Sequence, residues 1–250
     1  MITHLPHASP VIPAAAARAD YLVDGPTLRA EVEKLTDWYT DELFAYPGAT
    51  AVRAEFSRVY CDVERFADDA QEPMAAFGMG VLYATTDASA PLRDVSPARR
   101  ESILREVYWP HHRRLDAAVD AELAASGRAL IVDGHSFAST PFDRDRSKRT
   151  PRPDFNVGTD SYHTPAALVE ASRAYFRARG CSLGVDWPYD GALVPLKHYR
   201  RTPAVASIML EVNRALYLEE PSARKSKGFD RTRELVRGWM TEIEKVFDRG

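Results

Sequence analysis

An apolar run in this chain ends abruptly in side chains that can do chemistry. Residues 129–132 are typical of a buried strand, and the tetrapeptide Asp-Gly-His-Ser (133–136) follows them without a turn. In an open α/β sheet, ligands bind beyond the carboxyl ends of the strands. A second imidazole, His7, follows a short apolar stretch near the N-terminus. Together, His7 and His135 could supply two nitrogen ligands to a catalytic zinc, which usually takes three protein ligands and keeps a fourth position open. The alternative is that each histidine is satisfied within the core.

A carboxylate and three arginines form the second group of candidates. Glu211 stands in the apolar stretch 205–212, where a charged side chain is costly unless it is paired. It is either one half of a structural ion pair, with Arg214 as the partner, or a base that takes a proton from water beside a metal. Arg58, Arg65 and Arg214 each lie at the edge of an apolar stretch, where an arginine can bind a carboxylate through two nitrogens. The alternative for each is a solvated surface arginine.

Alternating strands and helices would position these residues. Apolar spacing and turn residues predict strands within residues 2–13, 49–66, 81–84, 129–135, 181–191 and 204–218. Helical spacing and capping residues predict helices over residues 26–46, 96–127, 164–180 and 229–250. Pro110 is expected to break or kink the second of these helices, and residues 143–154 are predicted to form a polar surface loop. The alternation indicates an α/β domain whose sheet carries helices on both faces.

Bulk composition limits the class of protein. The 250 residues carry a formal net charge of −3, without the basic excess that is typical of nucleic-acid-binding proteins. No apolar run reaches the roughly 18 residues of a transmembrane helix, and residues 1–13 lack the basic and apolar regions of a secretory signal. Cys61 and Cys181 make neither a metal motif nor a disulfide framework. We therefore expect one domain over residues 1–250, a cytoplasmic location, and a partner that is neither nucleic acid nor membrane. The oligomeric state stays open.

Six stretches, in order along the chain, resemble the N-formylglutamate amidohydrolase family. They are PHAS (6–9), LTDWYTDELF (35–44), SRVYCDVERF (57–66), VDGHSF (132–137), RPDFNVGTD (152–160) and MLEVNRALYLEE (209–220). That family is in turn similar to zinc carboxypeptidases and aspartoacylases. The resemblance implies a zinc-carboxypeptidase-like α/β fold, with a mixed, mostly parallel central sheet flanked by helices, and one zinc ion per chain.

The same resemblance implies roles for single residues. His7 and His135 look like zinc ligands, and Glu211 looks like the general base. Arg65 resembles the arginine of the family's Asp-x-Asn-Arg stretch, which holds a substrate carboxylate or polarises the scissile carbonyl. Further candidates for substrate contact are Arg58, Asn213 and Arg214.

Two positions depart from the related patterns. Carboxypeptidases carry a glutamate three residues after the first histidine, where this chain has Pro10, so the third metal ligand must come from elsewhere. Asp37 stands at the matching acidic place in the family pattern, with Asp41, one helical turn later, as the alternative. Glu64 replaces the asparagine of the Asp-x-Asn-Arg stretch. An acid beside a carboxylate-binding arginine would repel an acidic substrate, so this departure bears on specificity more than on hydrolysis.

Other polar residues receive lesser roles. Adjacent helical residues point about 100° apart, so His111 and His112 are expected to be helix residues and not a joint metal pair. Asp133 could orient His135 as an outer carboxylate. The residues expected to be structural or to shape a loop near the site are His163, His198, Asp154 and Thr159.

These roles predict a zinc-dependent amidohydrolase that acts on a linear amide bond. N-formyl-L-glutamate and water would give L-glutamate and formate, a reaction that the resemblance connects with histidine degradation. One alternative is a hydrolase of another N-acyl amino acid or small peptide, and the other is a non-catalytic binder of an acidic metabolite.

Overall fold

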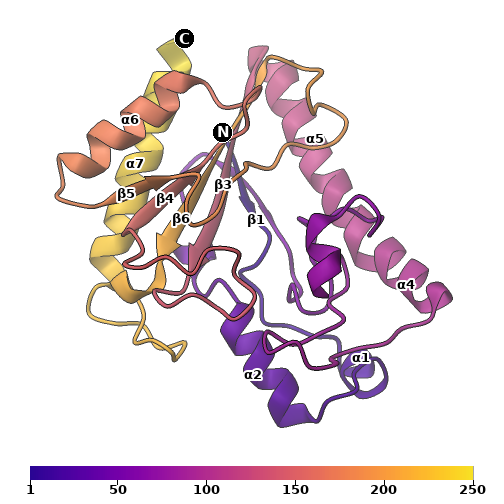
Figure 1. Cartoon of the computed structure of the whole chain (residues 1–250). Coiled ribbons are helices and arrows are strands. Elements are labelled where there is room, and N and C mark those ends of the chain that lie inside the picture. The colour runs from indigo at the N-terminus through magenta and orange to yellow at the C-terminus, as the bar shows by residue number, and fades with distance from the viewer. Residues whose placement is uncertain (250) are drawn as a thin grey trace.

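A single sheet of six strands forms the centre of the molecule (Figure 1). The computed structural model describes residues 1–249, so Gly250, the last residue of the predicted domain and C-terminal helix, lies outside the described residues. The strands are β1 (Ile2–Leu5), β2 (Thr50–Arg53), β3 (Ala129–Phe137), β4 (Phe155–Gly158), β5 (Leu183–Val185) and β6 (Val205–Asn213). Their order across the sheet is β2-β1-β3-β6-β4-β5. Because β4 runs antiparallel to β6 and the other pairs are parallel, the predicted mixed, mostly parallel α/β fold is confirmed.

Helices cover both faces of this sheet (Figure 1). The helix α6 (Ala166–Arg177) packs with α7 (Phe229–Arg249) on one face, and α5 (Trp109–Ser126) lies on the other. Side chains alternate between the faces of a strand. Val132 of β3 accordingly joins the core cluster of Trp239, whereas Ile131 joins that of Leu115. By the same alternation, His135 belongs to the face that α5 partly covers.

Shorter helices lie before and between the strands. They are α1 (Ala14–Ala19), α2 (Gly25–Leu35), α3 (Thr40–Leu43) and α4 (Pro97–Ile103), with single turns η1 (Pro73–Phe77), η2 (Leu104–Tyr108) and η3 (Arg214–Leu216). Within residues 1–249, no helix combines the length and the apolar character needed to cross a membrane.

The predicted helix 96–127 forms as α4, the π-helical turn η2 and α5 in direct succession. Ser96 caps its start by accepting a hydrogen bond from the Arg99 N–H, and Gly127 ends it at a φ of 76°. Pro110 is the second residue of α5, and its ring has no N–H to donate to the preceding turn. The irregularity expected at this proline therefore occurs as a π-helical turn just before it.

Three predicted elements are wrong in detail. The helix expected over 26–46 ends at Leu35, because the next residues leave helical geometry and Tyr39 has a φ of 61°. No strand forms over 54–66 or 81–84. The apolar residues of these segments are nevertheless buried, as Val59 and Val81 illustrate. They fill core clusters beneath loops, so their apolar character reflects burial and not strand pairing.

Candidate active site

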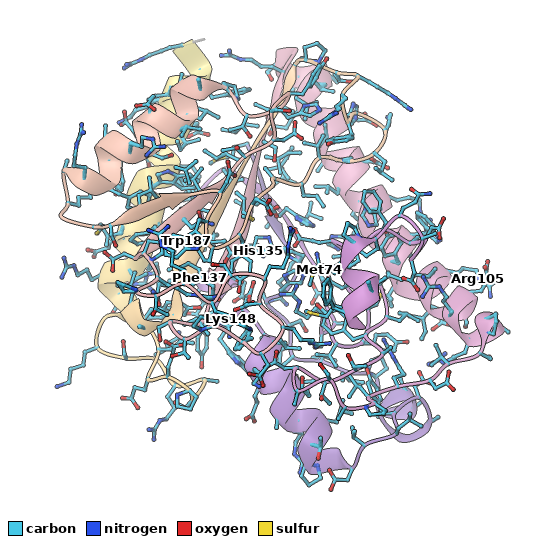
Figure 2. All side chains as sticks on the ribbon, viewed as in Figure 1. Met74, Arg105, His135, Phe137, Lys148 and Trp187 are labelled. Atoms are coloured by element: carbon cyan, nitrogen blue, oxygen red, sulfur yellow. The ribbon has the colours of Figure 1, made fainter. Side chains whose placement is uncertain are left out.

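A cavity of about 500 Å³ opens at the carboxyl ends of β1, β3 and β6. Figure 2 shows part of its lining: His135 and Phe137 come from β3, whereas Met74 and Trp187 come from two other segments. Titratable residues are unusually dense in the wall: they include His7, Asp37, Arg58, Glu64, Arg65, Arg144, His135, Glu211 and Arg214. The cavity therefore gathers the strand-end histidines and Glu211 in one place.

Three atoms that could bind a metal ion form a tight triangle in this cavity. The Nδ1 atoms of His7 and His135 lie 3.3 Å apart, and Asp37 Oδ2 lies 3.6 Å from the former and 3.3 Å from the latter. In a tetrahedral zinc site with ligand distances of about 2.0–2.2 Å, the ligand atoms are about 3.3–3.6 Å apart. The triangle thus has the dimensions of one face of such a site.

A break between two helices supplies the aspartate. Asp37 lies between α2 and α3, where its backbone N–H donates to the carbonyl of His7 at 3.0 Å. Arg214 Nη2 holds its second oxygen, Oδ1, at 2.8 Å, which leaves Oδ2 toward the imidazoles. Asp41, the alternative ligand, instead pairs with Arg53 and stands outside the cavity lining. The structure brings Asp37, and not Asp41, to the histidines.

The outer nitrogen of each imidazole meets a carboxylate. His7 Nε2 donates to Asp62 Oδ1 at 2.9 Å, and His135 Nε2 lies 3.1 Å from Glu64 Oε1 and 3.2 Å from Asp133 Oδ1. Carboxylates in this position fix the tautomer and the ring orientation of metal-binding histidines. Protons held at Nε2 leave Nδ1 free to coordinate a cation.

A second arrangement around Glu64 is also within reach of a cation. One atom each of His7, Glu64 and His135 lies within 4.8 Å of the others, and so does one atom each of His4, Glu64 and Asp133. Glu64 approaches the imidazoles from their Nε2 side, with its Oε2 atom 3.7 Å from His7 Nε2. The triangle with Asp37 is the tighter set, because all its edges are 3.6 Å or shorter.

The acidic surroundings strongly favour positive charge on both imidazoles. Burial and Arg58 act to lower the pKa of His7, but Asp62, Glu64 and Asp37 outweigh them and raise it. Burial likewise opposes a charge on His135, yet Glu64, Asp133 and Asp37 raise its pKa well above the ordinary value. Without a metal, protons supply the positive charge that these carboxylates require. A divalent cation in the triangle would supply it instead, so both the donor set and the charge fit a metal.

Glu211 has the features expected of a base. It pairs with His135 across the β3–β6 ladder, so both side chains lie on the same face of the sheet. The carboxyl is buried, and its Oε2 atom has no hydrogen-bond partner among the described residues. Burial, reinforced by Asp37 and Glu64 and opposed by His135 and Arg58, raises the pKa of Glu211 to about 8. A carboxyl poised near neutrality in a cavity is a candidate for proton transfer.

The predicted substrate contacts separate into two groups. Arg58 and Arg65 line the cavity, and both are drawn toward Asp62, at 3.1 and 3.8 Å respectively. Arg214 also lines it, but its guanidinium donates to Asp37, Ser136 and the Lys34 carbonyl, so it orients Asp37. Asn213 stands outside the lining. Its side chain donates to the Pro153 carbonyl and accepts from the Ala215 N–H, and it therefore supports the start of η3.

Sequence reasoning missed Asp62, which organises this part of the site. The carboxylate is fully buried and contacts His7, Arg58 and the Tyr83 hydroxyl, at 2.9, 3.1 and 2.6 Å. The sequence did contain a signal for it, because Asp62 is the first residue of the same Asp-x-x-Arg stretch that contains Arg65.

A series of hydrogen-bonded side chains extends from the site into the core beneath α5. Asp133 Oδ1 accepts from His4 Nδ1 at 2.8 Å, and His4 Nε2 lies 2.9 Å from His111 Nε2. The His4 Nδ1–H thus donates to Asp133, and its Nε2 atom faces His111. Burial and the neighbouring His4 lower the pKa of His111, which keeps it neutral. Asp133 thus contacts His135 as expected, and His111 supports His4 without reaching the cavity.

The remaining histidines and loop residues have local partners. His163 accepts from the Arg200 N–H and donates to the Val205 carbonyl, and His198 contacts Thr202 and Asp120. Asp154 bonds Ser182, and Thr159 bonds Asp186, which does line the cavity. These contacts give the four residues structural tasks.

Comparison with known proteins identifies relatives of the whole chain. Residues 1–218 match the family model described as N-formylglutamate amidohydrolase. The crystal structure of N-formylglutamate amidohydrolase from Ralstonia eutropha superposes with a TM-score of 0.86 at 24% identity, covering 100% of this chain and 94% of that one. The gene product Atu2144 from Agrobacterium tumefaciens superposes with a TM-score of 0.67 at 18% identity, covering 97% and 91%. No curated protein matches the chain. At these identities the two structures support the fold alone.

Proposed function

The chain belongs to the N-formylglutamate amidohydrolase family, and from that premise we propose that it hydrolyses N-formyl-L-glutamate to L-glutamate and formate with the help of a bound zinc ion. The observation that carries the proposal is the triangle of His7 Nδ1, His135 Nδ1 and Asp37 Oδ2, with the unpartnered Glu211 carboxyl on the adjacent strand.

Three residues would hold the metal. The edges of the triangle, 3.3 to 3.6 Å, suit a tetrahedral site, and the set of two imidazoles and one carboxylate is a common catalytic donor set for zinc. When bound, zinc acts as a Lewis acid that polarises a carbonyl oxygen and makes water more acidic. Asp62 and Asp133 would keep the two rings in the tautomer that such binding needs.

Glu211 would carry the proton through the reaction. Its free Oε2 atom can accept a proton from an attacking water and return it to the departing amine. A carboxyl with a raised pKa performs both transfers near neutral pH, because neither protonation state is strongly disfavoured. General acid–base catalysis of this kind contributes about 10²- to 10⁴-fold to rate.

Arg58 and Arg65 would supply fixed positive charge. Arg58 is held by Asp62 and the Tyr83 hydroxyl, so its position is defined before substrate arrives. Arg65 is less constrained, since its Nε atom lies 3.8 Å from Asp62 and makes no hydrogen bond to the described residues. One guanidinium beside the developing oxyanion and one on the substrate carboxylate would meet the electrostatic needs of amide hydrolysis.

Metal content and formate release test the proposal together. Protein purified without a histidine tag should contain about one zinc per chain by elemental analysis and should release formate from N-formyl-L-glutamate. Glu211→Gln should lower kcat by about 10²- to 10⁴-fold at unchanged zinc content. Glu234→Gln, an exposed glutamate of α7, is the matched control and should behave as the unsubstituted enzyme. Full activity in Glu211→Gln would overturn the assigned base, and failure to bind zinc even after its addition would overturn the metal chemistry.

A substrate panel separates this reaction from the alternatives. Other N-acyl amino acids cleaved faster than N-formyl-L-glutamate would keep the hydrolase and change its substrate. Binding of acidic ligands by metal-free protein, without turnover of any amide, would instead favour the non-catalytic binder.

A further inference from the structure

One arginine in the cavity wall has an unusual set of contacts. Arg144 belongs to the segment 143–154, which was expected to be only a polar surface loop, yet it lines the cavity. Its side chain is 5% exposed. A guanidinium so thoroughly removed from water needs partners for its N–H groups.

One terminal nitrogen is firmly anchored. Nη1 lies 3.3 Å from the Phe77 carbonyl, 3.0 Å from the Thr85 carbonyl and 2.9 Å from Thr85 Oγ1. The backbone N–H of Arg144 also donates to Asp87 Oδ1 at 3.1 Å. These four contacts fix both the base and the tip of the side chain, so the planar group presents its remaining edge in one orientation.

The opposite edge of the guanidinium lacks a partner. Nε and Nη2 of Arg144 are both buried without a hydrogen bond to the described residues. The nearest carboxylate oxygen, Asp87 Oδ1, is 3.9 Å from Nε, and the other Asp87 oxygen is engaged by Lys34 Nζ at 2.7 Å. Nε and Nη2 form the edge through which arginine takes a carboxylate by two parallel hydrogen bonds. A single carboxylate placed at this edge would therefore satisfy both N–H groups.

The positive charge around this edge also favours binding of an anion. Arg58 and Arg144 both approach Tyr83: Arg58 Nε donates to its hydroxyl at 2.9 Å, and the Arg144 guanidinium carbon lies 5.8 Å from its ring centre. Burial lowers the pKa of Arg144 and Arg58 adds to the effect, although Tyr83, Asp87 and Glu31 oppose it. Two neighbouring guanidinium groups, only one of which pairs closely with an acid, would be relieved by an added anion.

We propose that the Nε–Nη2 edge of Arg144 binds the side-chain carboxylate of the substrate, so that the site selects N-acyl amino acids with a second acidic group. The inference rests on the proposed function and adds a specificity residue to it. Arg65 is left for the α-carboxylate, which every N-acyl amino acid carries. Glu64, which points to the imidazoles, is compensated there by His135 and does not oppose an acidic ligand at Arg144.

Two ligands that differ in one group test the inference. N-formyl-L-glutamate and N-formyl-L-glutamine have the same size, but only the first has a side-chain carboxylate. Their dissociation constants would be measured by calorimetry on zinc-loaded Glu211→Gln protein, so that neither ligand is consumed. The glutamate compound should bind about 10- to 150-fold more tightly, the range for hydrogen bonds to a charged group. Adding Arg144→Gln should abolish this preference while leaving the glutamine compound within about 3-fold.

Further variants keep the test decisive. Arg144→Lys retains the charge without the two-pronged edge and should restore part of the preference, even where Arg144→Gln folds poorly. Arg105→Gln, on an exposed residue that Figure 2 places far from His135, is the control and should leave the preference intact. Equal binding of the two ligands before Arg144 is changed, or the same preference after Arg144→Gln, would overturn the inference.

The proposed function and this inference can fail separately. Turnover of N-formyl-L-glutamate by the unsubstituted enzyme, with unchanged selectivity in Arg144→Gln, would keep the hydrolase and remove Arg144 from recognition. Binding that depends on Arg144, without turnover of N-formyl-L-glutamate, would keep Arg144 in recognition and overturn the proposed hydrolase.

Discussion

Replacing Asp62 with asparagine should weaken metal binding and folding at the same time. The fully buried carboxylate accepts from His7 Nε2 at 2.9 Å and is the nearest acid to Arg58, at 3.1 Å. Loss of an outer carboxylate typically lowers metal affinity by about 10- to 100-fold, or about 1.4–2.7 kcal/mol. Loss of the counter-ion of a fully buried arginine costs about 3–5 kcal/mol of stability, and the Arg58 side chain is 16% exposed, so we expect a smaller loss. We expect both effects in Asp62→Asn.

The stability effect should depend on pH in a defined direction. Although burial opposes ionisation, His7, Arg58 and Arg65 hold the pKa of Asp62 well below its usual value. A depressed folded-state pKa stabilises the protein above the unfolded-state pKa, about 3.9 for aspartate, and that stabilisation is lost as the pH falls through the folded-state value. The stability difference between the two proteins should therefore be largest near pH 7 and should shrink below about pH 4.

Two measurements check this prediction. Urea denaturation of the metal-free proteins at several pH values gives the stability difference, and competition with a chelator gives the zinc affinity. Asp94→Asn, at an exposed position, is the control and should change neither quantity. If Asp62→Asn folds and binds zinc as tightly as the unsubstituted protein, the argument that Asp62 orients His7 is wrong. Asp62→Glu provides a charged variant in case the asparagine protein does not fold.

Three further predictions follow from the site and the strand behind it. Asp37→Asn should abolish stoichiometric zinc binding, whereas Asp41→Asn should retain it; elemental analysis of both variants distinguishes the two ligand assignments. Since the pKa values of His7 and His135 are raised, zinc must compete with protons for both rings, so calorimetry in buffers of different ionisation enthalpy should report a net release of protons at pH 7 and an affinity that rises with pH. Gly134→Ala should lower stability by about 1–3 kcal/mol in thermal unfolding, because a Cβ there would meet neighbouring core side chains at 2.9 Å.

Much of the architecture could be predicted from the alternation of strands and helices. The run before His135 and the apolar stretch around Glu211 became the long central strands β3 and β6. His7 and His135 could also be predicted as site residues, because each lies at the end of a predicted strand. These signals are local, because a strand and the residues that follow it occupy one segment of sequence.

Other features arise from contacts that sequence spacing does not record. The helical period continued from Leu35 to Trp38, but the chain leaves the helix there so that Asp37 can meet His7 and Arg214. The apolar character of Val81 correctly indicated that it is buried. It also suggested a strand, but Val81 lies in a loop. Arg144 looked like any charge in a polar loop, and only the folded structure reveals that its Nε–Nη2 edge is buried without a partner.

The pairing of His135 with Glu211 in adjacent strands has a consequence for how such a protein can change. Neighbouring strands are held about 4.8 Å apart by backbone hydrogen bonds, and side-chain substitutions do not alter that spacing. The distance between His135, the proposed metal ligand, and Glu211, the proposed base, is thus a property of the sheet, whereas Met74, Arg144 and Trp187 reach the same cavity from outside it. If the proposed function holds, mutation, insertion or exchange of these outer segments can therefore change which substrates bind while His135 and Glu211 keep their spacing. On the proposed function, selectivity would thus be free to evolve in segments outside the sheet, apart from the two strands that carry His135 and Glu211.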